Sequence, residues 1–140
     1  MTTTTLPQHQ ARARADYLNI ALWTFQGWLS MFFIAAGYAK LTESMENLTV
    51  LMTWPALTGE ALVRGVGVVE IVLAVLILAP VISWKIGKVP VLIAAAGLLA
   101  LEIAALLFHA VSLDVGLSLT NVFLIAITAP VLCLRRNLRA

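Results

Sequence analysis

Residues 91–111 read VLIAAAGLLALEIAALLFHAV, and this stretch decides the class of the protein. Its only ionisable side chains are Glu102 and His109. A helix needs about 20 mainly apolar residues to cross a hydrocarbon core about 30 Å thick. The stretch is therefore predicted to be a membrane-spanning helix that carries two polar side chains.

The composition of the whole chain agrees with a membrane protein. Of its 140 residues, 61% are apolar and 11% are charged, whereas a soluble domain has roughly 45–50% apolar and about 25% charged residues. The chain has too few polar residues to cover a water-soluble core. Its single cysteine, Cys133, excludes an internal disulfide, a CxxC redox pair and a thiolate metal cage.

Four apolar stretches are long enough to span a bilayer, so we expect an all-α, antiparallel four-helix membrane protein. The spans cover about 18–40, 61–82, 89–111 and 117–134. Pro80, Gly87 and Pro90 predict a turn between the second and third spans. The expected organisation is a flexible tail over 1–16, a transmembrane domain over 17–135 and a basic tail over 136–140.

The basic residues predict the orientation, because Lys and Arg accumulate in short cytoplasmic segments. Seven of them flank the spans on one side: Arg12, Arg14, Lys85, Lys88, Arg135, Arg136 and Arg139. Both termini are therefore expected in the cytoplasm and the spans in the plasma membrane. These residues can pair with anionic headgroups, so the basic pI of about 9.0 does not call for a nucleic-acid partner.

Each span carries one polar stripe at helical spacing. Gln26 and Lys40 share a face of the first span, Glu70 follows Gly67 in the second, and Glu102 lies seven residues before His109 in the third. Asn121 belongs to a similar stripe in the fourth span. Polar residues of membrane helices usually face the bundle interior, so the four stripes should converge on one axis.

Helix rise predicts that two acids meet inside this bundle. At 1.5 Å per residue, Glu70 and Glu102 each lie about 14 Å below the outer ends of their spans. Two level carboxylates in a low-dielectric interior do not both ionise readily. We therefore expect a proton-holding or cation-attracting pair in an outward-open pocket.

Four further residues complete the predicted ligand or proton site. Gln26 would be a neutral hydrogen-bond partner of the acids, His109 an outward proton relay, and Trp23 a wall of the pocket, with Asn121 nearer the outer surface. The alternative is that these polar residues only hold helices together, each contributing about 0.6 kcal/mol.

Lys40 and Arg64 lie near the outer mouth, where they would bind an anion or extend to lipid headgroups. No metal site is expected, because His9 lies on the opposite side of the membrane from His109.

The chain resembles the DoxX-like family of small four-helix membrane proteins. The resemblance rests on AAGYAKL with Gly37 and Lys40, RGVGVVE with Arg64 and Glu70, the later His109, and Asn121 in the last span. It implies a plasma-membrane bundle that often acts beside partners, since some relatives are subunits of thiosulfate:quinone oxidoreductases and others are membrane tethers in thiol-redox complexes. Glu102 lies outside the family's usual pattern.

Three functions are compatible with these observations. The first is a non-catalytic membrane subunit or a binding module for a small quinone-like, amine or lipid ligand. The second is a proton-coupled transporter, which would need to dimerise. The third is a membrane enzyme with a protonated glutamate as general acid. No cofactor is expected, and a homo-oligomer or a membrane redox partner is compatible with the sequence.

Overall fold

The computed structural model describes residues 8–137, and every regular element in that range is helical. Four helices are long and apolar enough to span a membrane, which confirms the predicted fold class. The elements are α1 (Gln8–Thr42), α2 (Met45–Met52), η1 (Trp54–Leu57), α3 (Glu60–Leu76), η2 (Ala79–Val81), α4 (Trp84–Val111) and α5 (Val115–Asn137).

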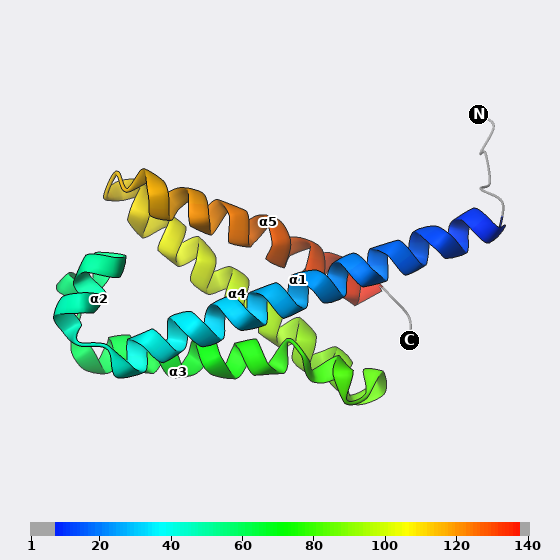
Figure 1. The fold of residues 1–140 in the computed structure, drawn as a ribbon, viewed down its shortest axis with the longest axis horizontal. Coiled ribbons are helices and arrows are strands. Elements are labelled where there is room, and N and C mark those ends of the chain that lie inside the picture. Colours follow the sequence, from blue (N-terminus) through cyan, green and yellow to red (C-terminus); the bar gives the residue numbers. More distant parts are fainter. Residues whose placement is uncertain (1–7, 138–140) are drawn as a thin grey trace.

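The long helices form two antiparallel pairs, α1 with α3 and α4 with α5 (Figure 1). The α1/α3 pair is very close where Gly37 meets Gly67. A Cβ atom at Gly37 would lie 2.6 Å from the Gly67 carbonyl oxygen, so only glycine allows this approach. In Figure 1 the two pairs diverge toward the end that carries α2 and the α4–α5 turn.

The two pairs are joined at the opposite end, which we call the terminal end because α1 begins there and α5 finishes there (Figure 1). There the start of α4 packs on η2, and the backbone of Pro80 lies against Gly87 so closely that a Cβ atom would clash. The turn predicted over Gly87 and Pro90 is wrong, since α4 already begins at Trp84. The connection is instead made by η2 around Pro80.

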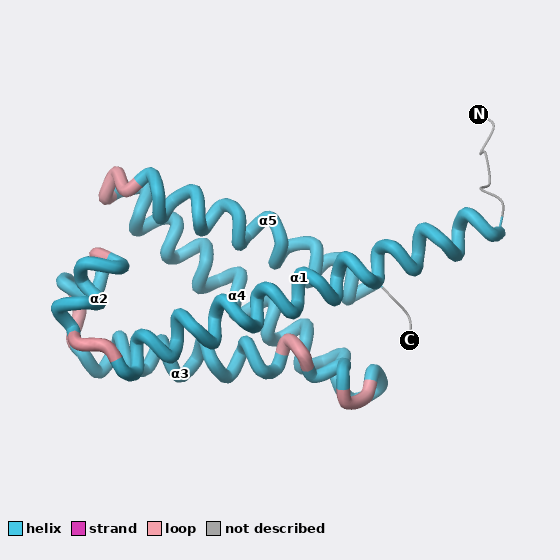
Figure 2. Tube along the Cα trace, viewed as in Figure 1, coloured by secondary structure: helices cyan, strands magenta, loops and turns pink. Residues whose placement is uncertain are grey.

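The first helix begins earlier than the predicted span. It runs without a break from Gln8, so the part of the expected tail over 8–16 is helical and projects past the bundle (Figure 2). Residues 1–7 and 138–140 of the two predicted tails lie outside the described residues. The connection between α1 and α3 contains α2 and η1, and Leu48 of α2 is buried.

The surface of the bundle is apolar. At most a third of the most apolar stretch of each span is buried inside the protein, and large aliphatic side chains such as Ile86, Ile93 and Leu107 are exposed. A surface of this kind is stable in lipid and not in water. The chain is therefore an integral membrane protein.

Candidate functional site

Glu70 forms an ion pair inside the α1/α3 pair. Lys40 Nζ donates to Glu70 Oε1 at 3.0 Å and to Oε2 at 2.8 Å, and both residues are buried, with 4% and 6% of their surface exposed. The Gly37–Gly67 contact brings the two backbones close enough for this pairing, since Glu70 follows Gly67 by one helical turn. Both oxygens of Glu70 thus contact the same cation, the Lys40 ammonium group.

Arg64 binds backbone carbonyls at the far end of the same helix pair. Its Nη1 donates to the carbonyls of Lys40 and Glu43, where α1 ends, and its Nε and Nη2 donate to Glu60. The carbonyls of the last helical turn have no partner within the helix. Arg64 therefore caps α1, and the predicted outer-mouth residues Lys40 and Arg64 both have partners within the chain.

Glu102 lies in the α4/α5 pair, and no cation of residues 8–137 lies within ion-pair distance of it. Thr128 Oγ1 donates to its Oε1 at 2.6 Å, while its Oε2 is buried without a hydrogen-bond partner among the described residues. Only 1% of the Glu102 surface is exposed. A buried polar atom of this kind costs free energy unless something outside the chain pairs with it.

His109 and Asn121 lie level with each other in the same helix pair. His109 lies two turns after Glu102 in α4, and Asn121 lies two turns before Thr128 in α5. Because the two helices are antiparallel and Glu102 contacts Thr128, His109 and Asn121 lie at the same height. His109 Nδ1 is buried and has no partner among residues 8–137. Asn121 donates to the Leu117 carbonyl. Two buried atoms without partners, on Glu102 and His109, therefore lie along one face of α4.

Gln26 and Trp23 belong to a third polar group, at the terminal end. Arg135 of α5 donates through Nε to Gln26 Oε1 at 2.8 Å and through Nη1 to Asn19 Oδ1 at 2.7 Å. Gln26 in turn donates to the Ile77 carbonyl at the end of α3. Trp23 stacks on the Arg135 guanidinium, with 4.9 Å from Cζ to the ring centre.

The structure therefore separates residues that the sequence places in one site. No hydrogen bond joins Glu70 to Glu102 in the described part of the chain; each acid has its partner inside its own helix pair. Gln26 and Trp23 lie with Arg135, away from both acids. His109, Asn121 and Glu102 share the α4/α5 pair. Their role in binding stays a prediction, as does that of Glu70.

Sequence reasoning missed Arg135, which it placed at the boundary of the basic tail. The residue is 1% exposed, and it lies seven residues after Thr128 and fourteen after Asn121. That spacing continues the polar stripe of the fourth span and was a signal that Arg135 faces the interior.

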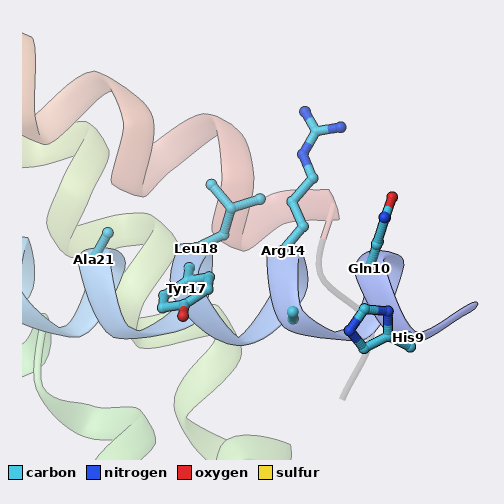
Figure 3. Close-up of a pocket in the computed structure, with 7 residues that line it drawn as sticks. His9, Gln10, Arg14, Tyr17, Leu18 and Ala21 are labelled. Atoms are coloured by element: carbon cyan, nitrogen blue, oxygen red, sulfur yellow. The ribbon is translucent and has the colours of Figure 1, made fainter. Parts of the chain in front are cut away.

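An open groove runs along the amino-terminal part of α1, outside the bundle (Figure 3). Its lining comes from that helix alone: His9, Gln10, Ala13, Arg14, Tyr17, Leu18 and Ala21. None of the predicted site residues lines it. Among residues 8–137, no three His, Cys, Asp or Glu side chains form a group that could hold a metal ion.

Comparison with known proteins identifies a family for most of the chain. No curated protein and no solved structure matches the chain. The model of the DoxX-like family matches residues 24–131, a range that includes the Lys40–Glu70 pair, Glu102 and His109 but ends before Arg135. The chain therefore belongs to the DoxX-like family of membrane proteins.

Proposed function

We propose that this protein is a non-catalytic membrane subunit that binds a small quinone-like lipophile in the α4/α5 pair, with Glu102 as its polar anchor. The observation that carries the proposal is the Glu102 carboxyl, which is buried and, among residues 8–137, has no cation beside it and no hydrogen-bond partner for one of its oxygens. A carboxyl in this state accepts or donates one more hydrogen bond, depending on its proton. A ligand carbonyl or hydroxyl supplies the missing partner.

His109 extends the binding site along α4. Its Nδ1 has no partner among the described residues. His109 lies seven residues after Glu102, which is about 10 Å along the helix axis at 1.5 Å of rise per residue. The two polar atoms lie on one buried face, among apolar side chains such as Leu98. Apolar walls with a few polar groups are typical of small-molecule sites.

Glu70 has a structural role in this proposal. Its two oxygens are occupied by Lys40, so it needs no further partner. This arrangement weighs against a proton-coupled transporter or a general-acid enzyme that would use both glutamates as one site, since the two acids have different partners.

Occupancy of the site is tested by native mass spectrometry of protein purified in mild detergent. We expect the wild type to carry a bound apolar molecule or to bind added short-chain benzoquinone. The control variant Glu60→Gln, which removes an exposed acid, should do the same. Occupancy should fall about tenfold in Glu102→Gln, as expected for a site that loses about 1.4 kcal/mol. Equal occupancy in both variants would overturn the proposal.

Absence of any bound molecule in all three proteins, with unchanged stability of Glu102→Gln, would also reject it. The interior polar residues would then serve only to hold the helices together.

We further propose that the terminal end faces the cytoplasm at the plasma membrane. Described basic residues gather at this end, namely Arg12, Arg14, Lys85, Lys88, Arg135 and Arg136, and such a bias is typical of the cytoplasmic side. A fluorescent protein fused after residue 140 should fluoresce, and alkaline phosphatase fused there should be inactive. The reverse result would contradict the orientation.

A partner helix has a surface to bind on α4. Ala96, Ala100 and Ala104 are exposed along one line of that helix, and small residues allow close helix contacts in membranes. We propose that a second copy or a membrane redox protein packs there. Cross-linking through Ala100→Cys, with Val72→Cys on the exposed face of α3 as control, should join the partner at position 100 only.

A further inference from the structure

The terminal end contains a buried arginine without a counter-ion. Arg135 has 1% of its surface exposed, and no acid among residues 8–137 lies within ion-pair distance of it. Its contacts through Nε and Nη1 go to Gln26 and Asn19, which are neutral amides. A buried cation is costly unless an anion or a full set of hydrogen bonds compensates it.

Two donor nitrogen atoms around Arg135 have no acceptor among the described residues. Arg135 Nη2 and Trp84 Nε1 are both buried without a hydrogen-bond partner in the described part of the chain. They are close together, since Arg135 Cζ lies 4.8 Å from the centre of the Trp84 ring. Arginine Nη2 and the indole nitrogen are donors only, so the missing group must be an acceptor.

The stacking geometry restricts how that acceptor approaches. Trp23 and Trp84 both stack on the guanidinium, with 4.9 Å and 4.8 Å from Cζ to the ring centres. Because Nε is bonded to Gln26, the open edge of the guanidinium plane is the one that carries Nη2. An oxyanion that lies in this plane can accept a charge-assisted hydrogen bond from Nη2.

We propose that Arg135 and Trp84 form a binding site for a phosphate oxyanion, supplied by the headgroup of an anionic phospholipid. Arg135 lies in the last turns of α5, where a spanning helix reaches the headgroup layer, and basic pockets between membrane helices bind lipid headgroups. Trp84 is the first residue of α4 and is half-buried, so the site lies near the surface of this end. The site is independent of Glu102 and of the function proposed above.

Lipid binding to delipidated protein in neutral detergent tests the proposal by native mass spectrometry. Phosphatidylglycerol is the probe, and diacylglycerol with the same acyl chains lacks the phosphate. We expect one tightly held phosphatidylglycerol on the wild type and on Arg136→Gln, the matched loss of an exposed neighbouring charge. Affinity should fall about tenfold or more in Arg135→Gln, which removes the charged donor, and diacylglycerol should bind none of the three tightly.

A second measurement keeps the proposal testable if Arg135→Gln does not fold. Trp84→Phe retains an aromatic ring and removes only the Nε1 donor. It should weaken phosphatidylglycerol binding about threefold to tenfold, as for one lost hydrogen bond. In the wild type, the indole ¹⁵N–¹H resonance that Trp84→Phe removes should shift when phosphatidylglycerol is added.

Three results would overturn the proposal. Equal phosphatidylglycerol affinity in Arg135→Gln and Arg136→Gln excludes Arg135 as the binding residue, and an unmoved Trp84 indole resonance excludes the site in the folded wild type. Inorganic phosphate that binds as tightly as the lipid overturns the lipid as source, although the oxyanion site itself would then be supported.

Discussion

The two helix pairs treat their buried glutamates in opposite ways. In the α1/α3 pair, Glu70 has Lys40 on both oxygens. In the α4/α5 pair, Glu102 accepts a hydrogen bond from the Thr128 hydroxyl, and its other oxygen has no partner among residues 8–137. The first arrangement is complete within the chain, whereas the second lacks a group.

The comparison shows why burial alone does not identify a functional acid. Glu70 and Glu102 are both buried, with 6% and 1% of their surface exposed, and both lie on helices in the membrane. They differ in their counter-charge: Lys40 pairs with Glu70, whereas no cation of the described residues pairs with Glu102. Removing the cation of a paired buried acid is costly because it leaves the charge uncompensated, and an acid without a counter-charge is held at a cost that a ligand or a proton offsets.

The largest effect is expected when Lys40 is removed. Lys40→Met leaves Glu70 buried without its cation and should lower the free energy of unfolding by about 3–5 kcal/mol. Unfolding in mixed micelles measures this loss. The exposed Lys85→Met should change stability little, and an equally small effect of Lys40→Met would show that the buried pair is not a stabilising contact.

A smaller loss should follow from widening the same helix pair. In Gly67→Ala the new Cβ would lie 2.9 Å from the Gly37 carbonyl oxygen and from Lys40 Cβ, so the helices must separate, at a cost of about 1–3 kcal/mol. Gly65→Ala has open space at its Cβ and serves as the control. Equal thermal stability of the two variants would contradict the close α1/α3 contact.

The α4/α5 pair should respond more weakly to loss of the contact between Thr128 and Glu102. Thr128→Val removes the hydrogen bond to Glu102 and should cost about 0.6 kcal/mol, as is usual for hydrogen bonds between membrane helices. Thr120→Val, on the exposed face of α5, is the reference. A loss as large as that of Lys40→Met would mean that the two pairs are equally dependent on their acids.

The smallest effect is expected at the surface ion pair of α3. Glu60→Gln removes an exposed partner of Arg64 and should change stability by about 0.5 kcal/mol or less. Arg64 keeps its bonds to the carbonyls of Lys40 and Glu43. Thermal melting of the variant checks this, and a large shift would show that Glu60, rather than those carbonyls, positions Arg64.

Much of this architecture follows from composition and periodicity. Apolar length alone predicts four spans, and helical spacing puts Gln26, Glu70, Glu102 and His109 on buried faces, as the structure shows. The family resemblance carried by Gly37 and Glu70 is also confirmed. These features depend on one helix at a time, so a single sequence contains them.

Features that depend on pairs of helices were harder to predict. Equal depth suggested that Glu70 faces Glu102, but the long side chain of Lys40 reaches Glu70 within the α1/α3 pair. Arg135 follows a span, where a basic residue usually faces headgroups, but its burial and its contact with Gln26 show that it points inward. The start of α4 was misplaced because Gly87 serves close packing on Pro80 and does not form a turn.

Double-mutant cycles on the unfolding free energy test the division into two helix pairs most directly. Lys40→Met combined with Glu70→Gln should show a coupling of at least about 1.5 kcal/mol, because the residues contact each other. Glu70→Gln combined with Glu102→Gln should be additive within about 0.5 kcal/mol. Strong coupling between the two glutamates, with none between Lys40 and Glu70, would contradict the account.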